Sequence, residues 1–216
     1  MPRESQKSKA ERTERILAVL KDEFPDATCS LNYENPLQLL IATILSAQCT
    51  DERVNMVTRE LFKAYQTAAD FADAPIGDIE EMVRSTGFYR NKAKSVKACC
   101  EALMEKHDGV VPDTMEELTP LAGVGRKTAN VVLGNAFGKE EGVVVDTHVR
   151  RISNLLRLTR KDDPVKIEQD LVKVVPRTDW TLFSHLLIRH GRKTCVARRP
   201  DCANCRIAED CPSAVS

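Results

Sequence analysis

The stretch LAGVGRKTANVV, residues 121–132, places a lysine where a helix is expected to begin. Gly123 and Gly125 mark a turn, and the apolar residues that follow recur at helical spacing. Lys127 therefore falls in the first helical turn beside Arg126, although the N-terminus of a helix carries partial positive charge. A charged ammonium is disfavoured there, and a partly desolvated, neutral amine is a nucleophile. Lys127 is thus a candidate nucleophile, or else one more contact for a phosphate.

The turn before Lys127 can be compared with three glycine-loop chemistries. A phosphate-binding P-loop needs glycine where Arg126 stands, and a dinucleotide fingerprint needs glycine in place of Thr128, after a strand. What remains is a helix–hairpin–helix, in which Gly123 and Gly125 let the backbone pass close to a neighbour. The free N–H groups at the start of the second helix, with Arg126, could hold a phosphate without reading a base. The alternative is an ordinary turn between two helices.

An acidic residue, Asp146, stands just before the amphipathic run THVRRISNLL. Aspartate is a favoured N-cap, so its side chain is expected to accept the backbone N–H of His148 or Val149. A carboxylate held in this way could also stabilise positive charge that develops on a sugar, or help to move the proton of Lys127. His148 is expected to have a structural role.

Four cysteines in the last part of the sequence follow the spacing C-x6-C-x2-C-x5-C. They are Cys195, Cys202, Cys205 and Cys211. Four thiolates in so short a segment could bind a tetrahedral zinc ion or a [4Fe–4S] cluster, with two disulfides as the alternative. A metal centre would pin the intervening loop, so that Arg198 and Arg199 could meet phosphates with little ordering entropy left to lose. Otherwise these arginines are merely solvated.

These residues must be positioned by a chain that has a helical pattern nearly throughout. Asn35 before Pro36, and Asp163 before Pro164, predict helix starts, and Gly191 predicts a helix end. The single strand signal is the short run GVVVD at 142–146. The predicted fold class is all-α with short connections.

Composition fits a globular protein, with 42% hydrophobic and 30% charged residues. The net charge is zero, but the segment 189–199 carries five basic residues and no acid, as a face that meets a polyanion would. The longest apolar run, 36–47, is shorter than a membrane span and predicts a buried core helix. Because the first residues are polar, we expect a cytoplasmic protein with reduced thiols.

Five sequence features occur together in a characteristic order: LSAQCTD, GFYRNKAKSV, AGVGRKTANVVL, VDTHVRRISNLL and the four-cysteine spacing. Together they closely resemble the endonuclease III family of base-excision DNA glycosylases. The resemblance implies two helical domains flanking a DNA-binding cleft. One would be a six-helix barrel domain at 29–140 that carries the helix–hairpin–helix. The other would be an iron–sulfur cluster domain formed by 1–28 and 141–216.

The resemblance also implies roles for individual residues. Lys127 matches the catalytic lysine that attacks C1′ of the deoxyribose, and Asp146 matches the essential aspartate. Gln48 matches the residue that fills the hole left in the duplex, and Phe88 falls in the loop that wedges between bases. The hairpin residues Gly123, Gly125 and Arg126, with Arg198 and Arg199, would bind DNA. The cluster ligands would be Cys195, Cys202, Cys205 and Cys211.

The implied activity is bifunctional: removal of oxidised pyrimidines from double-stranded DNA, and cleavage at the resulting abasic site by β-elimination. The enzyme would act at the nucleoid as a monomer.

Ala122 stands where the family hairpin usually has proline, and Phe88 where bacterial members more often have leucine. A mismatch-specific or adenine glycosylase is the alternative enzyme, although related enzymes that only remove bases lack the lysine. A non-catalytic DNA-binding metal module is the alternative outside catalysis.

Overall fold

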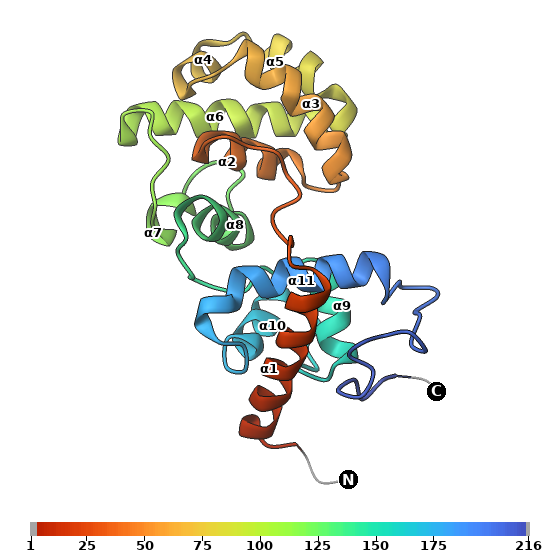
Figure 1. Cartoon of the computed structure of the whole chain (residues 1–216). Coiled ribbons are helices and arrows are strands. Elements are labelled where there is room, and N and C mark those ends of the chain that lie inside the picture. The colour runs from red at the N-terminus through yellow and green to blue at the C-terminus, as the bar shows by residue number, and fades with distance from the viewer. Residues whose placement is uncertain (1–3, 215–216) are drawn as a thin grey trace. The chain divides into compact units, whose positions relative to one another are not determined.

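The protein is described by a computed structural model over residues 4–214. In this range the chain forms eleven α-helices, two short 3₁₀ helices and no β-strand (Figure 1). The all-α prediction is therefore confirmed. None of the helices in the described range is long and apolar enough to cross a lipid bilayer.

The chain divides into two compact units, each with its own hydrophobic core. The central unit is Cys29–Glu141, and the terminal unit combines the chain up to Thr28 with the chain from Gly142 onwards. The elements of the central unit are α2 (Pro36–Leu45), α3 (Asp51–Ala64), α4 (Ala68–Asp73), α5 (Ile76–Val83), η1 (Arg84–Thr86), α6 (Tyr89–His107), α7 (Met115–Leu118) and α8 (Arg126–Phe137). Those of the terminal unit are α1 (Gln6–Glu23), α9 (Thr147–Leu155), α10 (Pro164–Leu171), η2 (Arg177–Asp179) and α11 (Trp180–Lys193).

Helix α2 is the buried centre of the central unit. Its sequence PLQLLIATIL is apolar on all sides, so it is stable only when other helices surround it. Every residue from Leu39 to Leu45 is buried, and α3, α6 and α8 pack against it. The prediction of a buried core helix in this run is confirmed.

Several helices begin where the sequence predicts, because the capping side chain and the backbone it binds are neighbours. Asn35 accepts the N–H of Gln38 at 3.0 Å with Pro36 as the first helical residue. Asp163 does the same for Lys166 at 3.0 Å. Each cap satisfies a backbone donor that the helix itself leaves unpaired.

The helix end predicted at Gly191 is wrong, since α11 continues to Lys193. Gly191 is buried inside the helix, and a Cβ placed on it would lie 2.7 Å from His148 Nδ1 and 2.8 Å from Ile152 Cδ1. The glycine is needed because α11 approaches α9 closely, so its role is packing and not helix termination.

The predicted strand run and the segment of the four spaced cysteines form neither helix nor strand. The run GVVVD is not a strand in the described chain, and Val143, Val144 and Val145 are buried. The segment from Thr194 to Ala214, which carries the four spaced cysteines, consists of turns and bends. We call this segment the cysteine loop.

Candidate active site and cysteine loop

The hairpin before Lys127 is built as the glycine spacing predicts. Helix α8 begins at Arg126, with Gly125 as its N-cap. Lys127 lies in the first turn, and its side chain is exposed. The exposed side chain leaves Lys127 accessible to a ligand. Exclusion of water from this amine would require a bound ligand.

The two hairpin glycines occupy different surroundings. Gly123 has φ +78°, and a Cβ on it would lie 3.0 Å from Ser95 Cβ and 3.4 Å from Ile44 Cγ2. The hairpin backbone thus passes tightly over α6 and α2. Gly125 has a φ that any residue adopts, and a Cβ there would have no heavy atom within 4 Å. This open side of the hairpin leaves room for a ligand at the start of α8.

Asp146 is the N-cap of α9, as predicted. Its Oδ1 accepts the backbone N–H of Val149 at 2.7 Å, and the side chain is half-buried. The other carboxylate oxygen is not used by this cap. The cap holds the carboxylate in one orientation, which is a requirement for an electrostatic role in catalysis.

Gln48 and Phe88 share a strained backbone conformation. Among residues 4–214, four non-glycine residues have positive φ, and Gln48 (φ 53°) and Phe88 (φ 47°) are two of them. Both side chains are exposed, and that of Phe88 retains 65% of its accessible surface. Such conformations cost roughly 1–3 kcal/mol and persist where the surroundings enforce them. The two residues that resemble DNA-inserting groups are therefore held outward by strained turns.

The four cysteines of the loop face one space. All four line a cavity of about 80 Å³, together with apolar side chains that include Ile152, Leu156 and Ile207. Burial raises the pKa of the Cys205 thiol, the Ile207 backbone N–H lowers it, and the other three cysteines raise it further. That mutual effect requires the four sulfur atoms to be neighbours.

Two side chains direct nitrogen atoms at these sulfurs. Arg151 Nη1 donates to Cys195 Sγ at 3.6 Å, and His190 Nε2 lies 3.8 Å from Cys205 Sγ. Such contacts would stabilise thiolates over thiols. Within the described chain, no group of three or more His, Cys, Asp or Glu side chains has the geometry to hold a single metal ion.

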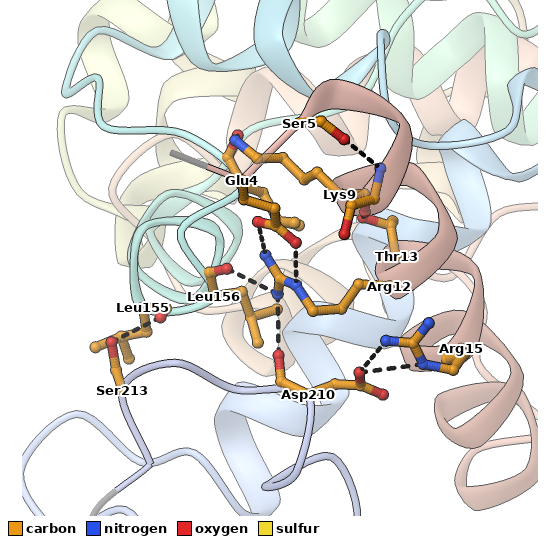
Figure 2. A network of polar contacts seen from close by, with 12 residues as sticks. Glu4, Ser5, Lys9, Arg12, Thr13, Arg15, Leu155, Leu156, Asp210 and Ser213 are labelled. Carbon is orange, nitrogen blue, oxygen red and sulfur yellow. Dashed lines mark hydrogen bonds and ion pairs between the residues drawn. The ribbon is translucent and has the colours of Figure 1, made fainter. Parts of the chain in front are cut away.

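A buried arginine connects the cysteine loop to the first helix (Figure 2). Arg12 of α1 donates through Nη1 to Leu156 O at 3.0 Å and to Asp210 O at 2.9 Å, directly before Cys211. Its Nε and Nη2 bind the two oxygens of Glu4 at 2.9 and 2.8 Å. Arg12 therefore satisfies two backbone carbonyls that the loop and the end of α9 cannot satisfy themselves.

Sequence analysis missed Arg12, although a signal was present. Arg12 precedes Ile16 and Leu20 at intervals of four residues, so it lies on the buried face of α1. A cation in an apolar stripe indicates a buried partner.

Arg198 and Arg199 are exposed in the cysteine loop, between the first two cysteines. The predicted site residues are thus divided between the units. The central unit carries Gln48, Phe88, Gly123, Gly125, Arg126 and Lys127, and the terminal unit carries Asp146, Cys195, Arg198, Arg199, Cys202, Cys205 and Cys211.

Residues 41–177, which span the hairpin and Asp146, match the model of the HhH-GPD superfamily of base excision DNA repair proteins. The chain is 55% identical to endonuclease III of Synechocystis sp. over 207 residues, which are 96% of this chain and 94% of that protein. It is 40% identical to endonuclease III of Escherichia coli, covering 94% of this chain and 96% of that protein. The chain belongs to the endonuclease III family.

Solved structures agree with this assignment. The structure described as a non-covalent endonuclease III–DNA complex superimposes with a TM-score of 0.89 at 42% identity, covering 95% of this chain and 96% of that chain. A thermostable thymine-DNA glycosylase has a TM-score of 0.83 at 20% identity, covering 94% and 97%, and shares the fold.

As a member of the endonuclease III family, the protein is a DNA glycosylase with AP lyase activity that acts on DNA in base excision repair.

Proposed function

We propose that this enzyme removes oxidised pyrimidines from double-stranded DNA and then cleaves the strand at the abasic site by β-elimination. The observation that carries the proposal is Lys127, an exposed amine in the first turn of α8. It directly follows a hairpin whose outer side is open at Gly125. A phosphate bound at the start of α8 would bring a nearby sugar towards this amine.

The reaction would start with attack of the lysine on the sugar. Neutral Lys127 Nζ attacks C1′, the bond from C1′ to the base breaks, and the base leaves as an anion that takes up a proton. Asp146 stabilises the positive charge that develops on the sugar. The C1′–O4′ bond then breaks, O4′ takes a proton from the amine, and a Schiff base forms between Nζ and C1′. Water accepts the proton that leaves C2′, the bond from C3′ to the phosphate oxygen breaks, and the phosphate leaves with the 3′ strand. Hydrolysis of the Schiff base releases the lysine.

The strained side chains would prepare the DNA for this reaction. Phe88 would enter the stack as an apolar wedge while Gln48 fills the space left by the extruded nucleotide. Arg126, Arg198 and Arg199 would bind phosphates, which position the duplex without reading its sequence. Both candidate reacting residues belong to one chain, so a single copy suffices, and chromosomal DNA as substrate implies work at the nucleoid in the cytoplasm.

We also propose that the cysteine loop holds a [4Fe–4S] cluster, that the terminal unit is the iron–sulfur domain, and that the central unit forms a helical barrel. Four soft sulfur donors line one cavity with apolar walls. Spacing alone allows zinc or a cluster, and membership of the endonuclease III family favours the cluster. Cys195, Cys202, Cys205 and Cys211 would be the ligands. When bound, the cluster would pin the loop that carries Arg198 and Arg199.

Borohydride trapping tests the role of Lys127. Reduction during turnover on a thymine-glycol duplex should give a covalent protein–DNA adduct, and Lys127→Gln should abolish it. Lys166→Gln is a matched control, because Lys166 is also an exposed lysine in the first turn of a helix, α10. An equal adduct yield from Lys127→Gln would refute the Schiff-base assignment.

A panel of defined duplexes tests the substrate class. Thymine-glycol duplexes should be cleaved much faster than duplexes with a normal mismatched base. The opposite ranking would favour a mismatch-specific or adenine glycosylase. Salt-sensitive binding without scission of an abasic duplex would favour a non-catalytic module.

Visible absorption tests the metal assignment. Purified protein should absorb near 400 nm and contain iron and sulfide, and colourless protein with stoichiometric zinc would contradict the cluster.

A further inference from the structure

Lys92 of α6 is a buried lysine that none of the proposed reaction steps uses. Only 5% of its surface is exposed, whereas lysine side chains normally keep their amine in water. A buried ammonium is tolerated only with a hydrogen-bond partner. Here Nζ donates to the backbone carbonyl of Thr86 at 2.7 Å.

The bonded carbonyl lies at the start of an unusual turn. Gly87 has φ 72° and ψ 155°, a combination that is almost restricted to glycine. Phe88 follows with φ 47° and ψ 28°, a left-handed conformation at the position that precedes α6. We call Thr86–Phe88 the wedge loop. Glycine adopts this conformation without strain, but Phe88 carries a cost at positive φ and will relax unless other contacts hold it.

Lys92 contacts the wedge loop on both sides of this strain. Its side chain binds the carbonyl of Thr86, and its backbone N–H binds the carbonyl of Phe88 at 3.1 Å. Thr86 is itself fixed, because its Oγ1 donates to Val83 O at 2.8 Å. The Phe88 side chain is largely exposed, so its own packing contributes little to the shape of the loop. Backbone bonds must therefore define it.

The same amine lies within electrostatic range of the other strained turn. Burial lowers the pKa of Lys92, and the thiol of Cys49, which follows Gln48 in the chain, raises it. Lys92 thus bonds to the turn at Phe88 and feels the charge of the residue next to Gln48.

We propose that Lys92 is a positioning residue that presets the wedge loop, so that Phe88 enters the duplex without a prior rearrangement. This inference rests on the proposed role of Phe88 in base extrusion. Loss of the Lys92 amine would let the loop relax, and the enzyme would then have to re-form the strained shape on each encounter with DNA.

The test compares two buried or half-buried lysines of one helix. Lys92→Met removes the bond to the wedge loop. Lys97→Met is the matched control, because Lys97 donates in the same way to the carbonyls of Ala72 and Ala74, at the end of α4. Both variants should lose thermal stability, and Lys92→Arg should restore part of the loss caused by Lys92→Met.

Two readouts separate positioning from general destabilisation. Single-turnover excision from a thymine-glycol duplex should fall about tenfold in Lys92→Met and stay near wild type in Lys97→Met. Cleavage of an abasic site in single-stranded DNA needs no wedge, so each variant should match wild type there. The rise in fluorescence of 2-aminopurine placed next to the lesion, which reports unstacking, should shrink in Lys92→Met alone.

The outcomes distinguish failure of the Lys92 proposal from failure of the wedge role proposed for Phe88. Normal duplex excision by Lys92→Met, or equal losses on duplex and single strand, would overturn the role of Lys92. Phe88→Ala serves as the reference. If Phe88→Ala also leaves duplex excision and 2-aminopurine fluorescence unchanged, the wedge assignment itself fails; if only Phe88→Ala is impaired, Lys92 alone is excluded.

Discussion

The glycine hairpin and the cysteine loop hold their candidate functional residues in opposite ways. In the hairpin, Gly123 packs on side chains of α6 and α2, and α8 starts three residues later, so short-range backbone geometry presents Lys127. The cysteine loop has no helix or strand, and its carbonyl at Asp210 is bound by Arg12, 198 residues earlier in the chain. The difference shows that the hairpin needs neighbours only to leave room for its glycine, whereas the irregular loop needs a distant side chain to donate hydrogen bonds to its backbone.

This comparison predicts that Arg12→Met is the most damaging single change outside the reacting groups. The buried carbonyl of Leu156 and the partly buried carbonyl of Asp210 would lose their donor, and Glu4 would lose its partner. We expect a cost of about 3 kcal/mol in the free energy of unfolding. Urea denaturation measures the loss. Arg15→Met is the control: its side chain is 59% exposed, so loss of its bond to Asp210 should cost much less stability than Arg12→Met does. Equal losses in the two variants would mean that the buried carbonyls do not matter.

The contribution of Arg12 should also depend on pH. The hydrogen bond from Arg12 lowers the pKa of Glu4 below its ordinary value of 4.5, and the positive charge of Arg12 adds to this. A lowered carboxyl pKa stabilises the fold above the ordinary value, and that stabilisation is lost as the pH falls through the lowered pKa. The stability gap between wild type and Arg12→Met should therefore stay constant above the ordinary pKa of 4.5. It should narrow as the pH falls from 4.5 through the lowered pKa of Glu4. A gap that narrows towards alkaline pH would contradict the assignment.

A pair of glycine substitutions tests what shapes the hairpin. Gly123→Ala must place a Cβ against Ser95 at φ +78° and should cost about 2 kcal/mol of stability. Gly125→Ala meets no atom within 4 Å and should cost less than about 1 kcal/mol, since only the cap preference changes. Thermal unfolding ranks the two variants. If Gly125→Ala were the less stable, the close approach at Gly123 would not be what shapes the turn.

The smallest effect concerns the tip of the cysteine loop. Replacing both Arg198 and Arg199 by alanine should leave stability unchanged, because both side chains are exposed. If each contacts one phosphate, the slope of log affinity against log salt should become shallower by about 2 units. Titrating a duplex that carries an abasic-site analogue at several salt concentrations measures the slope. Arg206→Ala is the control from the same loop, because Arg206 is paired with Asp22 at 2.7 Å. If Arg206→Ala changed the salt slope as much as the double variant does, specific phosphate contacts at Arg198 and Arg199 would be refuted.

The sequence alone determined the features that depend on near neighbours in the chain. Asn35, Asp146 and Asp163 cap helices as predicted, because a capping oxygen and its N–H partner lie only three residues apart. The all-α class and the position of Lys127 in the first turn of α8 follow from the same short-range rules. Gly191 was misinterpreted because a glycine serves equally as a helix end or as a point of close packing, and only the approach of α9 distinguishes the two.

Tertiary structure decided which partners the buried charges bind. Helical spacing places Arg12 on the buried face of α1, but only the folded chain shows that it binds the carbonyl of Asp210. In the same way, only the folded chain shows that Lys92 binds the carbonyl of Thr86 at a strained turn. The left-handed turns at Gln48 and Phe88 could not be predicted from the sequence, since neither residue type favours positive φ. Burial of an ion and strain in a backbone are favourable only when the rest of the fold compensates for them, and that compensation comes from contacts which no local pattern specifies.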